Sequence, residues 1–161
     1  MGISVVSVGK NKDSYIKEAS EEYRKRISPF TELDLVYLPD VALTKTNNQE
    51  VVIEKEGKFI EDYIEERLRK CPKPLFLIVL DSRGKQFKSE EFAKIIEEKS
   101  SFFDIICFIG GVYGLSPNII RKANLVLSIS KMTFTHQMTR IILLEQIYRA
   151  FSIIKGKKYH Y

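Results

Sequence analysis

Three loops of small and polar residues could bind a ligand, and each of them follows a short apolar run. They span residues 80–85, 110–114 and 130–135. Glycine has no Cβ atom, so the backbone of such a loop turns sharply and approaches a ligand closely. Open parallel sheets bind ligands in the crevice outside the carboxyl ends of their strands. We therefore expect the three loops to meet at one sheet edge and to form one cofactor pocket.

Each loop also has an ordinary structural interpretation when it is taken alone. The glycines at 110, 111 and 114 suit a tight turn, and Met132 and Phe134 suit a core. Gly110 and Gly111 are adjacent, which does not match the dinucleotide-binding pattern, and no phosphate-binding Gly-Lys-Ser/Thr loop is present. The convergence of the three loops favours a ligand site. Backbone N–H and C=O groups of the loop at residues 130–135 can read an adenine edge. The apolar side chains that would cover the ring are Leu80, Ile129, Met132 and Phe134.

Three polar residues near or within the last predicted helix are candidates for the substrate side of this pocket. His136 begins that helix, where a capping or structural role is the alternative to catalysis. Arg140 and Arg149 are candidate phosphate ligands, because a guanidinium offers two parallel donors. Glu145 precedes Arg149 by four residues, so a surface ion pair is the alternative for Arg149.

The composition fits one globular domain, residues 1–161, of an intracellular protein. The net charge is +5 and the pI about 9.1, which permits a nucleic-acid partner without requiring one. The two cysteines, Cys71 and Cys107, fit neither a disulfide framework nor a zinc site, and the chain has two histidines, so we expect no metal and a reducing cytoplasmic location. No apolar run approaches the roughly 18 residues of a membrane span, so we expect no membrane contact.

Apolar runs alternate with helical periodicity along the whole chain. The runs predict strands at residues 3–8, 33–38, 75–80, 105–109 and 125–129. The periodicity predicts helices at residues 14–27, 49–68, 89–99, 117–123 and 136–154, the third beginning with Ser89 as its N-cap. This alternation predicts an α/β fold with a mostly parallel sheet and helices on both faces.

Two of the predicted helices have unusual features. In the second, we interpret the charges at residues 54–56 as a solvated face, and close packing would explain Gly57. The last helix is apolar nearly all round, which predicts burial nearly all round. A subunit interface would supply that burial, so we expect a homodimer packed through this helix.

Several short motifs occur in one order over nearly the whole chain. They are Val8-Gly9-Lys10, Lys55-Glu56-Gly57, Ile109-Gly110-Gly111, Gly114-Leu115, the run from Ser130 to Phe134, His136-Gln137-Met138, Tyr148-Arg149-Ala150 and Tyr159-His160. In this order and at this chain length, the sequence resembles the RlmH family of ribosomal RNA methyltransferases, which belongs to the SPOUT (trefoil-knotted) superfamily.

The resemblance implies a SPOUT-type α/β fold with a C-terminal trefoil knot, a homodimer, and S-adenosylmethionine bound in the knot. It also implies methylation of N3 of a pseudouridine in 23S rRNA on the assembled ribosome. Carried onto this sequence, the cofactor contacts are Leu80, Gly110, Ile129, Ser130, Lys131, Met132, Thr133 and Phe134. The catalytic and substrate-side residues are His136, Arg140, Arg149, Tyr159 and His160.

The family pattern leaves some points open. Thr135 stands where the family usually has proline, and Tyr161 ends the chain where relatives often carry a basic residue. The N3 proton could pass to His136 or His160, or arginine electrostatics could suffice. The alternatives to this function are a SPOUT methyltransferase that acts on tRNA and a non-enzymatic RNA- or ribosome-binding module.

Overall fold

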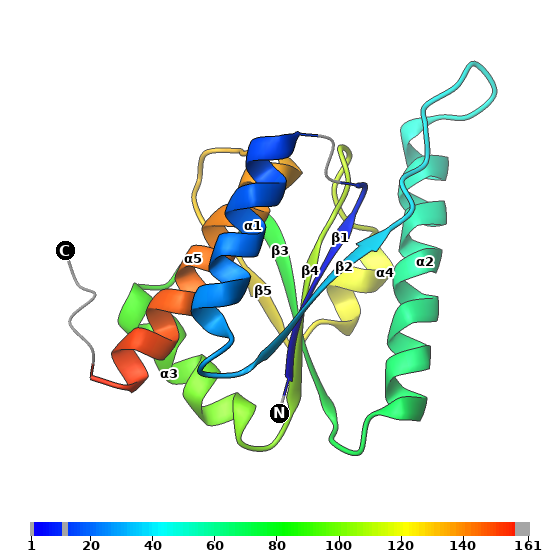
Figure 1. Cartoon of the computed structure of the whole chain (residues 1–161). Coiled ribbons are helices and arrows are strands. Elements are labelled where there is room, and N and C mark those ends of the chain that lie inside the picture. The colour runs from blue at the N-terminus through cyan, green and yellow to red at the C-terminus, as the bar shows by residue number, and fades with distance from the viewer. Residues whose placement is uncertain (1, 11–12, 157–161) are drawn as a thin grey trace.

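The computed structural model describes residues 2–10 and 13–156. A five-stranded sheet lies at its centre (Figure 1). The strands are β1 (Gly2–Val8), β2 (Glu32–Leu38), β3 (Leu75–Lys85), β4 (Asp104–Ile109) and β5 (Leu125–Leu127). Their order is β2-β1-β4-β3-β5, and neighbouring strands pair in parallel. The predicted mostly parallel sheet is therefore confirmed.

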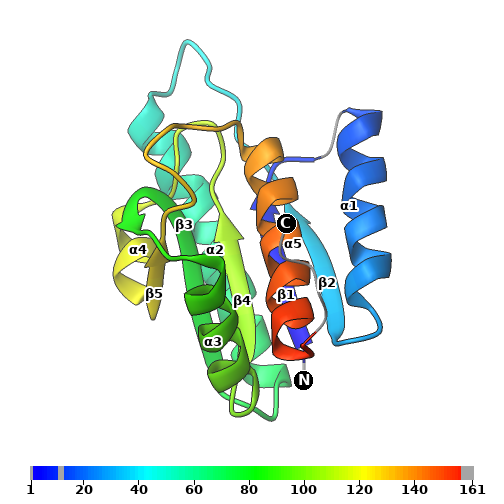
Figure 2. The same ribbon diagram turned by 90° about the vertical axis from the view of Figure 1, so that its left-hand side faces the viewer.

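Helices cover both faces of the sheet, also as predicted. They are α1 (Ser14–Ile27), α2 (Gln49–Lys70), α3 (Ser89–Ser100), α4 (Pro117–Lys122) and α5 (His136–Ile154). Helices α1, α3 and α5 lie on one face, and α2 and α4 lie on the other (Figures 1 and 2). The trefoil knot remains a prediction of the family resemblance.

The central strands β1 and β4 are apolar because both of their faces are covered. Successive side chains of a strand point to opposite faces. Val5 and Cys107 accordingly pack with α1, α3 and α5, whereas Val6 and Phe108 pack with α2 and α4. The sheet thus separates two buried apolar layers. Both layers hold the strands in place, and the strands in turn position the loops at their carboxyl ends.

The sheet edge next to β5 differs from the prediction. Strand β3 continues to Lys85 past an irregularity after Leu80, and β5 ends at Leu127. The irregular segment stays on the edge because Lys85 pairs with Leu127 and Gly84 lies against β5. A Cβ atom at Gly84 would stand 2.7 Å from the Val126 carbonyl oxygen. Residues 81–85 are thus a strand-like border of the site instead of a free loop.

Ser89 does not cap α3, so that prediction was wrong. Lys88 is the N-cap residue, and its backbone N–H donates to Glu91 Oε2 at 2.7 Å. The Ser89 hydroxyl instead donates to Gln146 Oε1 of α5 at 2.9 Å. The Ser89 hydroxyl therefore bonds to another helix instead of capping its own. The local sequence does not reveal this partner, because Gln146 is far away along the chain.

The chain itself buries much of α5. This helix lies on the sheet between α1 and α3 (Figure 2). Its buried apolar residues are Leu143, Leu144, Ile147, Ala150 and Phe151. Packing within one chain therefore explains why α5 is apolar around most of its circumference. The homodimer stays a prediction.

Helix α2 packs more closely than its charges suggest. Glu54 and Lys55 are exposed as predicted, but Glu56 is only 4% exposed, so its assignment to a solvated face was wrong. A Cβ atom at Gly57 would stand 2.7 Å from Ser116 Oγ at the start of α4. The glycine is therefore explained by close packing, as expected.

Candidate cofactor and substrate site

The three predicted loops meet at the carboxyl ends of β3, β4 and β5, where they line a cavity of about 270 Å³. The cavity takes residues from each loop and from the start of α5. Its lining consists of Leu80, Asp81, Ser82, Ile109, Gly110, Gly111, Val112, Gly114, Leu127, Ile129, Ser130, Met132, Thr133, Phe134, His136 and Thr139. The expected convergence is thus present in the fold.

The loop after β4 is both a tight turn and a wall of the cavity. The Gly114 N–H donates to the Gly111 carbonyl at 3.1 Å, and Gly114 has φ +85°. A Cβ atom at Gly110 would stand 2.6 Å from the Gly114 carbonyl carbon. Gly110 is therefore required by the turn itself, in addition to any ligand.

The loop after β5 is held in shape by its own hydroxyl groups. Ser128 Oγ donates to the Ser130 carbonyl, and Ser130 Oγ accepts from the Met132 N–H, both at 3.0 Å. Met132 and Phe134 are 71% and 43% exposed, so they are not core residues. Both line the cavity, where apolar side chains suit an aromatic ring.

The departure from the family pattern at Thr135 has a local role. Thr135 is the N-cap of α5, and its Oγ1 accepts from the Met138 N–H at 3.3 Å. A side-chain cap satisfies one of the free N–H groups at a helix start. This cap fixes the start of the helix, where proline would have fixed φ instead.

Asp81 is a residue of the cavity that the sequence analysis did not select. Its two oxygens accept from Arg83 Nε and Nη2, each at 2.9 Å. The Arg83 guanidinium lowers the pKa of Asp81, against the opposing effect of burial. The cavity is therefore lined by an ionised carboxylate. Asp81 directly follows the predicted cofactor contact Leu80, and this position in the sequence could have identified it as a site residue.

His136 and Arg140 occupy consecutive turns of α5 but different environments. His136 lines the cavity. Arg140 is 0% exposed, its Nε donates to Ser7 Oγ at 2.9 Å, and its guanidinium lies 4.7 Å from the Tyr37 ring centroid. Burial lowers the pKa of Arg140, and Tyr37 opposes that effect. The structure thus places Arg140 behind the site, away from the cavity wall.

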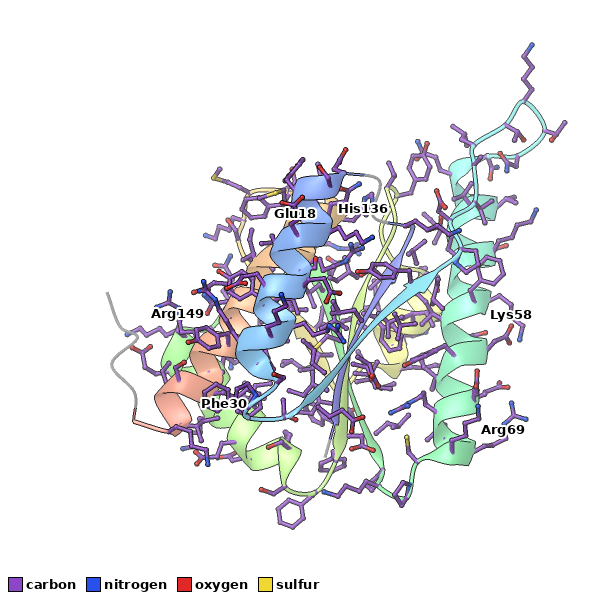
Figure 3. All side chains as sticks on the ribbon, viewed as in Figure 1. Glu18, Phe30, Lys58, Arg69, His136 and Arg149 are labelled. Atoms are coloured by element: carbon purple, nitrogen blue, oxygen red, sulfur yellow. The ribbon has the colours of Figure 1, made fainter. Side chains whose placement is uncertain are left out.

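Arg149 is not brought to the cavity within one chain. Figure 3 shows His136 and Arg149 far apart along α5, and thirteen residues of helix span roughly 20 Å. Arg149 Nε donates to Glu145 Oε1 at 3.0 Å, which is the alternative ion pair. Tyr159 and His160 lie outside the described residues.

A smaller cavity of about 170 Å³ adjoins the first, and the sequence analysis did not predict it. The two share Gly111, Val112 and His136. The second cavity extends toward the segment that follows β2, and its lining includes the acidic residues Asp40 and Glu56. Within residues 2–10 and 13–156, no cluster of three His, Cys, Asp or Glu side chains could hold a metal ion.

The fold and the cavity define a parallel α/β domain with a ligand site at the carboxyl edge of its sheet. A family model described as "Predicted SPOUT methyltransferase" matches residues 1–160. This chain belongs to the SPOUT methyltransferase family.

Curated relatives match over their full length. The chain is 43% identical over 159 residues to "Ribosomal RNA large subunit methyltransferase H" of Caldicellulosiruptor saccharolyticus, covering 98% of this chain and 99% of that protein. It is 44% identical over 167 residues to the protein of the same name from Clostridium beijerinckii, covering 99% of each.

Solved structures share the fold at low sequence identity. A probable methylase family protein from Haemophilus influenzae superposes with a TM-score of 0.59 at 16% identity, covering 99% of this chain and 70% of that chain. A probable methyltransferase from Bordetella pertussis gives 0.58 at 14% identity, covering 92% and 93%. These likenesses support the fold assignment alone.

As a SPOUT methyltransferase, the protein is an enzyme that uses S-adenosylmethionine as its methyl donor. The cavity fits this cofactor by its chemistry. Apolar side chains can cover the adenine ring, loop amides and carbonyls can read its edge, and the Asp81 carboxylate can face hydroxyl groups or positive charge. When bound, the cofactor supplies an activated methyl group on a sulfonium. In the described residues, no helix is long and apolar enough to cross a membrane.

Proposed function

We propose that this enzyme methylates N3 of a pseudouridine in 23S rRNA on the assembled ribosome, and therefore works in the cytoplasm. The observation that carries the proposal is the cavity formed by three loops at one sheet edge, in a chain of this family. The relatives' printed names specify large-subunit ribosomal RNA, which favours rRNA over tRNA. The net charge of +5 suits an RNA substrate.

The proposed cofactor contacts fall on all three loops. They are Leu80, Gly110, Ile129, Ser130, Lys131, Met132, Thr133 and Phe134. All of these except Lys131 line the cavity. The side chain of Lys131 is exposed, so its proposed contact is through the backbone.

The protein's contribution to methyl transfer is positioning. Two reactants held in near-attack geometry react faster than they do free in solution. The bound cofactor would supply the methyl group to the pyrimidine N3, which must give up its proton. His136, at the junction of the two cavities, is the proposed acceptor of that proton. Arg140, one turn further along α5 and held by Ser7, adds positive charge behind His136.

The proposed homodimer uses the part of α5 that the chain leaves uncovered. Met138 in the first turn is 39% exposed, and Met132 and Phe134 of the preceding loop are exposed too. Neighbouring exposed apolar side chains mark interaction sites. Sedimentation at micromolar concentration should give a particle of twice the 18.7-kDa chain. A stable monomer would contradict the proposed dimer but would not affect the proposed reaction.

The C-terminal tail is proposed to serve RNA methylation. Tyr159 could stack on a base and the lysines could meet phosphates. A chain truncated after Ile154 should keep the dimer and most of its cofactor affinity, yet lose methyl transfer to ribosomes. Methylation at the wild-type rate would exclude a catalytic or docking role for the tail, including Tyr159 and His160. Unfolding of the truncated chain would instead show that the tail is structural.

The reaction itself is tested by mass spectrometry of RNA nucleosides from a strain that lacks the gene. N3-methylpseudouridine should disappear from 23S rRNA and return when the wild-type gene is restored. Loss of a methyl group from tRNA instead would favour the tRNA alternative. Unchanged methylation of all RNA would favour a non-enzymatic RNA-binding module.

A further inference from the structure

The smaller cavity has an acidic side that the proposed reaction does not yet use. It lies between the segment after β2 and the loop after β4, and its lining includes Gly9, Asp40, Val41, Glu56 and Gly111. It adjoins the cofactor cavity, because Gly111, Val112 and His136 line both cavities. A ligand in the smaller cavity would therefore lie beside the cofactor.

Glu56 is the buried carboxylate of this cavity. Its Oε1 accepts from the Val41 N–H at 3.0 Å. Its Oε2 is buried against Gly111, and no donor from the described part of the chain reaches it. A Cβ atom at position 111 would stand 2.6 Å from Oε2, so any side chain there would take the place beside this oxygen. A buried acceptor without a donor is costly to the fold, and a bound group that donates a hydrogen bond to it would remove that cost.

Asp40 is the second carboxylate and lies at the exposed side of the cavity. Gly9, which has φ +90°, passes between Asp40 and His136. A Cβ atom at Gly9 would stand 3.8 Å from Asp40 Cβ and 3.6 Å from His136 Nε2. Gly9 therefore lies next to both an acid and the proposed proton acceptor, and its positive φ is the reason for glycine at this position.

The charge of this cavity indicates which part of an RNA it can receive. Ionised carboxyl groups only accept hydrogen bonds. They repel phosphate, so the cavity does not suit the RNA backbone. An acceptor-lined space beside a methyl donor suits the N–H-bearing edge of a base.

We propose that Asp40 and Glu56 recognise the N1–H group of the target pseudouridine. This inference rests on the proposed function. Pseudouridine is joined to its ribose through C5, so N1 carries a hydrogen that uridine lacks, whereas both bases carry the N3–H that methylation replaces. Acceptors placed for N1–H favour pseudouridine, because uridine would leave a buried acceptor unpaired.

The test compares methylation of two ribosome preparations, one with pseudouridine at the target and one with uridine from a strain that lacks the corresponding pseudouridine synthase. Wild-type kcat/KM should favour pseudouridine by about 10- to 100-fold, the range for a hydrogen bond to a charged group. Glu56→Gln retains an oxygen for Val41, and Asp40→Asn changes an exposed residue. Each variant should keep its cofactor affinity. In each, the ratio of kcat/KM for pseudouridine to kcat/KM for uridine should fall toward one. Glu54→Gln, on the exposed face of α2, is the matched control and should keep the preference.

The outcomes separate the two proposals. Loss of preference in either variant, with cofactor affinity retained by calorimetry, supports recognition by the acidic side. Wild-type preference in both variants overturns it, and so does a wild-type enzyme that methylates both ribosomes equally well. If the wild-type enzyme methylates neither preparation, the proposed function fails instead.

Discussion

The two cavities on either side of Gly111 differ in how they are built. The cofactor cavity is made by three loops that each follow a strand directly, and its walls are mostly backbone and apolar side chains. The acidic cavity brings together β1, the segment after β2, α2 and the loop after β4. The first follows from the topology of the sheet alone. The second depends on how one helix packs against two distant loops.

The largest expected effect is the loss of cofactor binding when the loop after β4 is distorted. Gly110→Val should weaken S-adenosylmethionine binding by about 100-fold or more, which corresponds to about 2.7 kcal/mol. The added atoms would overlap the Gly114 backbone, whose carbonyl carbon lies 2.6 Å from the Cβ position. Calorimetric titration measures the affinity.

Gly2→Val is the matched control for this variant, because a Cβ atom there has no neighbour within 4 Å. It should bind the cofactor as the wild type does. Near-normal binding by a folded Gly110→Val protein would show that the loop after β4 is not a wall of the cofactor site.

A smaller effect, on the stability of the fold, is expected from a substitution in α2, the helix that carries Glu56 of the acidic cavity. Gly57→Ala should lower the free energy of unfolding by about 1–2 kcal/mol, the balance of an overpacking cost of about 1–3 kcal/mol and a gain in helix propensity. The Cβ atom would stand 2.7 Å from Ser116 Oγ, and the gain in helix propensity of about 1 kcal/mol would be outweighed. Denaturant titration gives the difference.

A second substitution relieves the same contact. Ser116→Gly removes the obstructing hydroxyl and costs only a few tenths of a kcal/mol as an N-cap. The double variant should therefore be more stable than Gly57→Ala alone. Additive losses in the two variants would mean that the contact between α2 and α4 does not explain the glycine.

The smallest effect concerns the pH dependence of stability. Burial raises the pKa of Glu56 above its ordinary 4.5, the Val41 N–H opposes this, and Asp40 adds to it. A raised folded-state pKa gives a contribution that is present below the unfolded value and lost as pH rises through the folded value. The stability of the wild type relative to Glu56→Gln should therefore fall as pH rises above 4.5. Denaturant titrations from pH 4 upward test this, and a difference that rises with pH would contradict it.

The contrast between the cavities also shows what the sequence could predict. Residues 110–114 and 130–135 follow strands whose apolar runs are continuous, so their common position at one edge follows from a parallel sheet. Glu56 stands in the family motif Lys55-Glu56-Gly57, but the charge pattern of the run does not distinguish it from the exposed Glu54. Its burial comes from Val41 and Gly111, which lie 15 and 55 positions away. The interior position of Arg140 likewise depends on Ser7 and Tyr37, more than 100 residues earlier.

Hydrogen exchange of the wild-type protein with and without S-adenosylmethionine tests most directly whether the three loops form the cofactor site. The cofactor should slow exchange of the backbone amides at residues 110–114 and 129–134, where the loops line the larger cavity. The amides around Gly9 and Val41, on the acidic side, should change far less. Slowed exchange confined to the acidic side, or none at residues 129–134 under saturating cofactor, would contradict the assignment of the site.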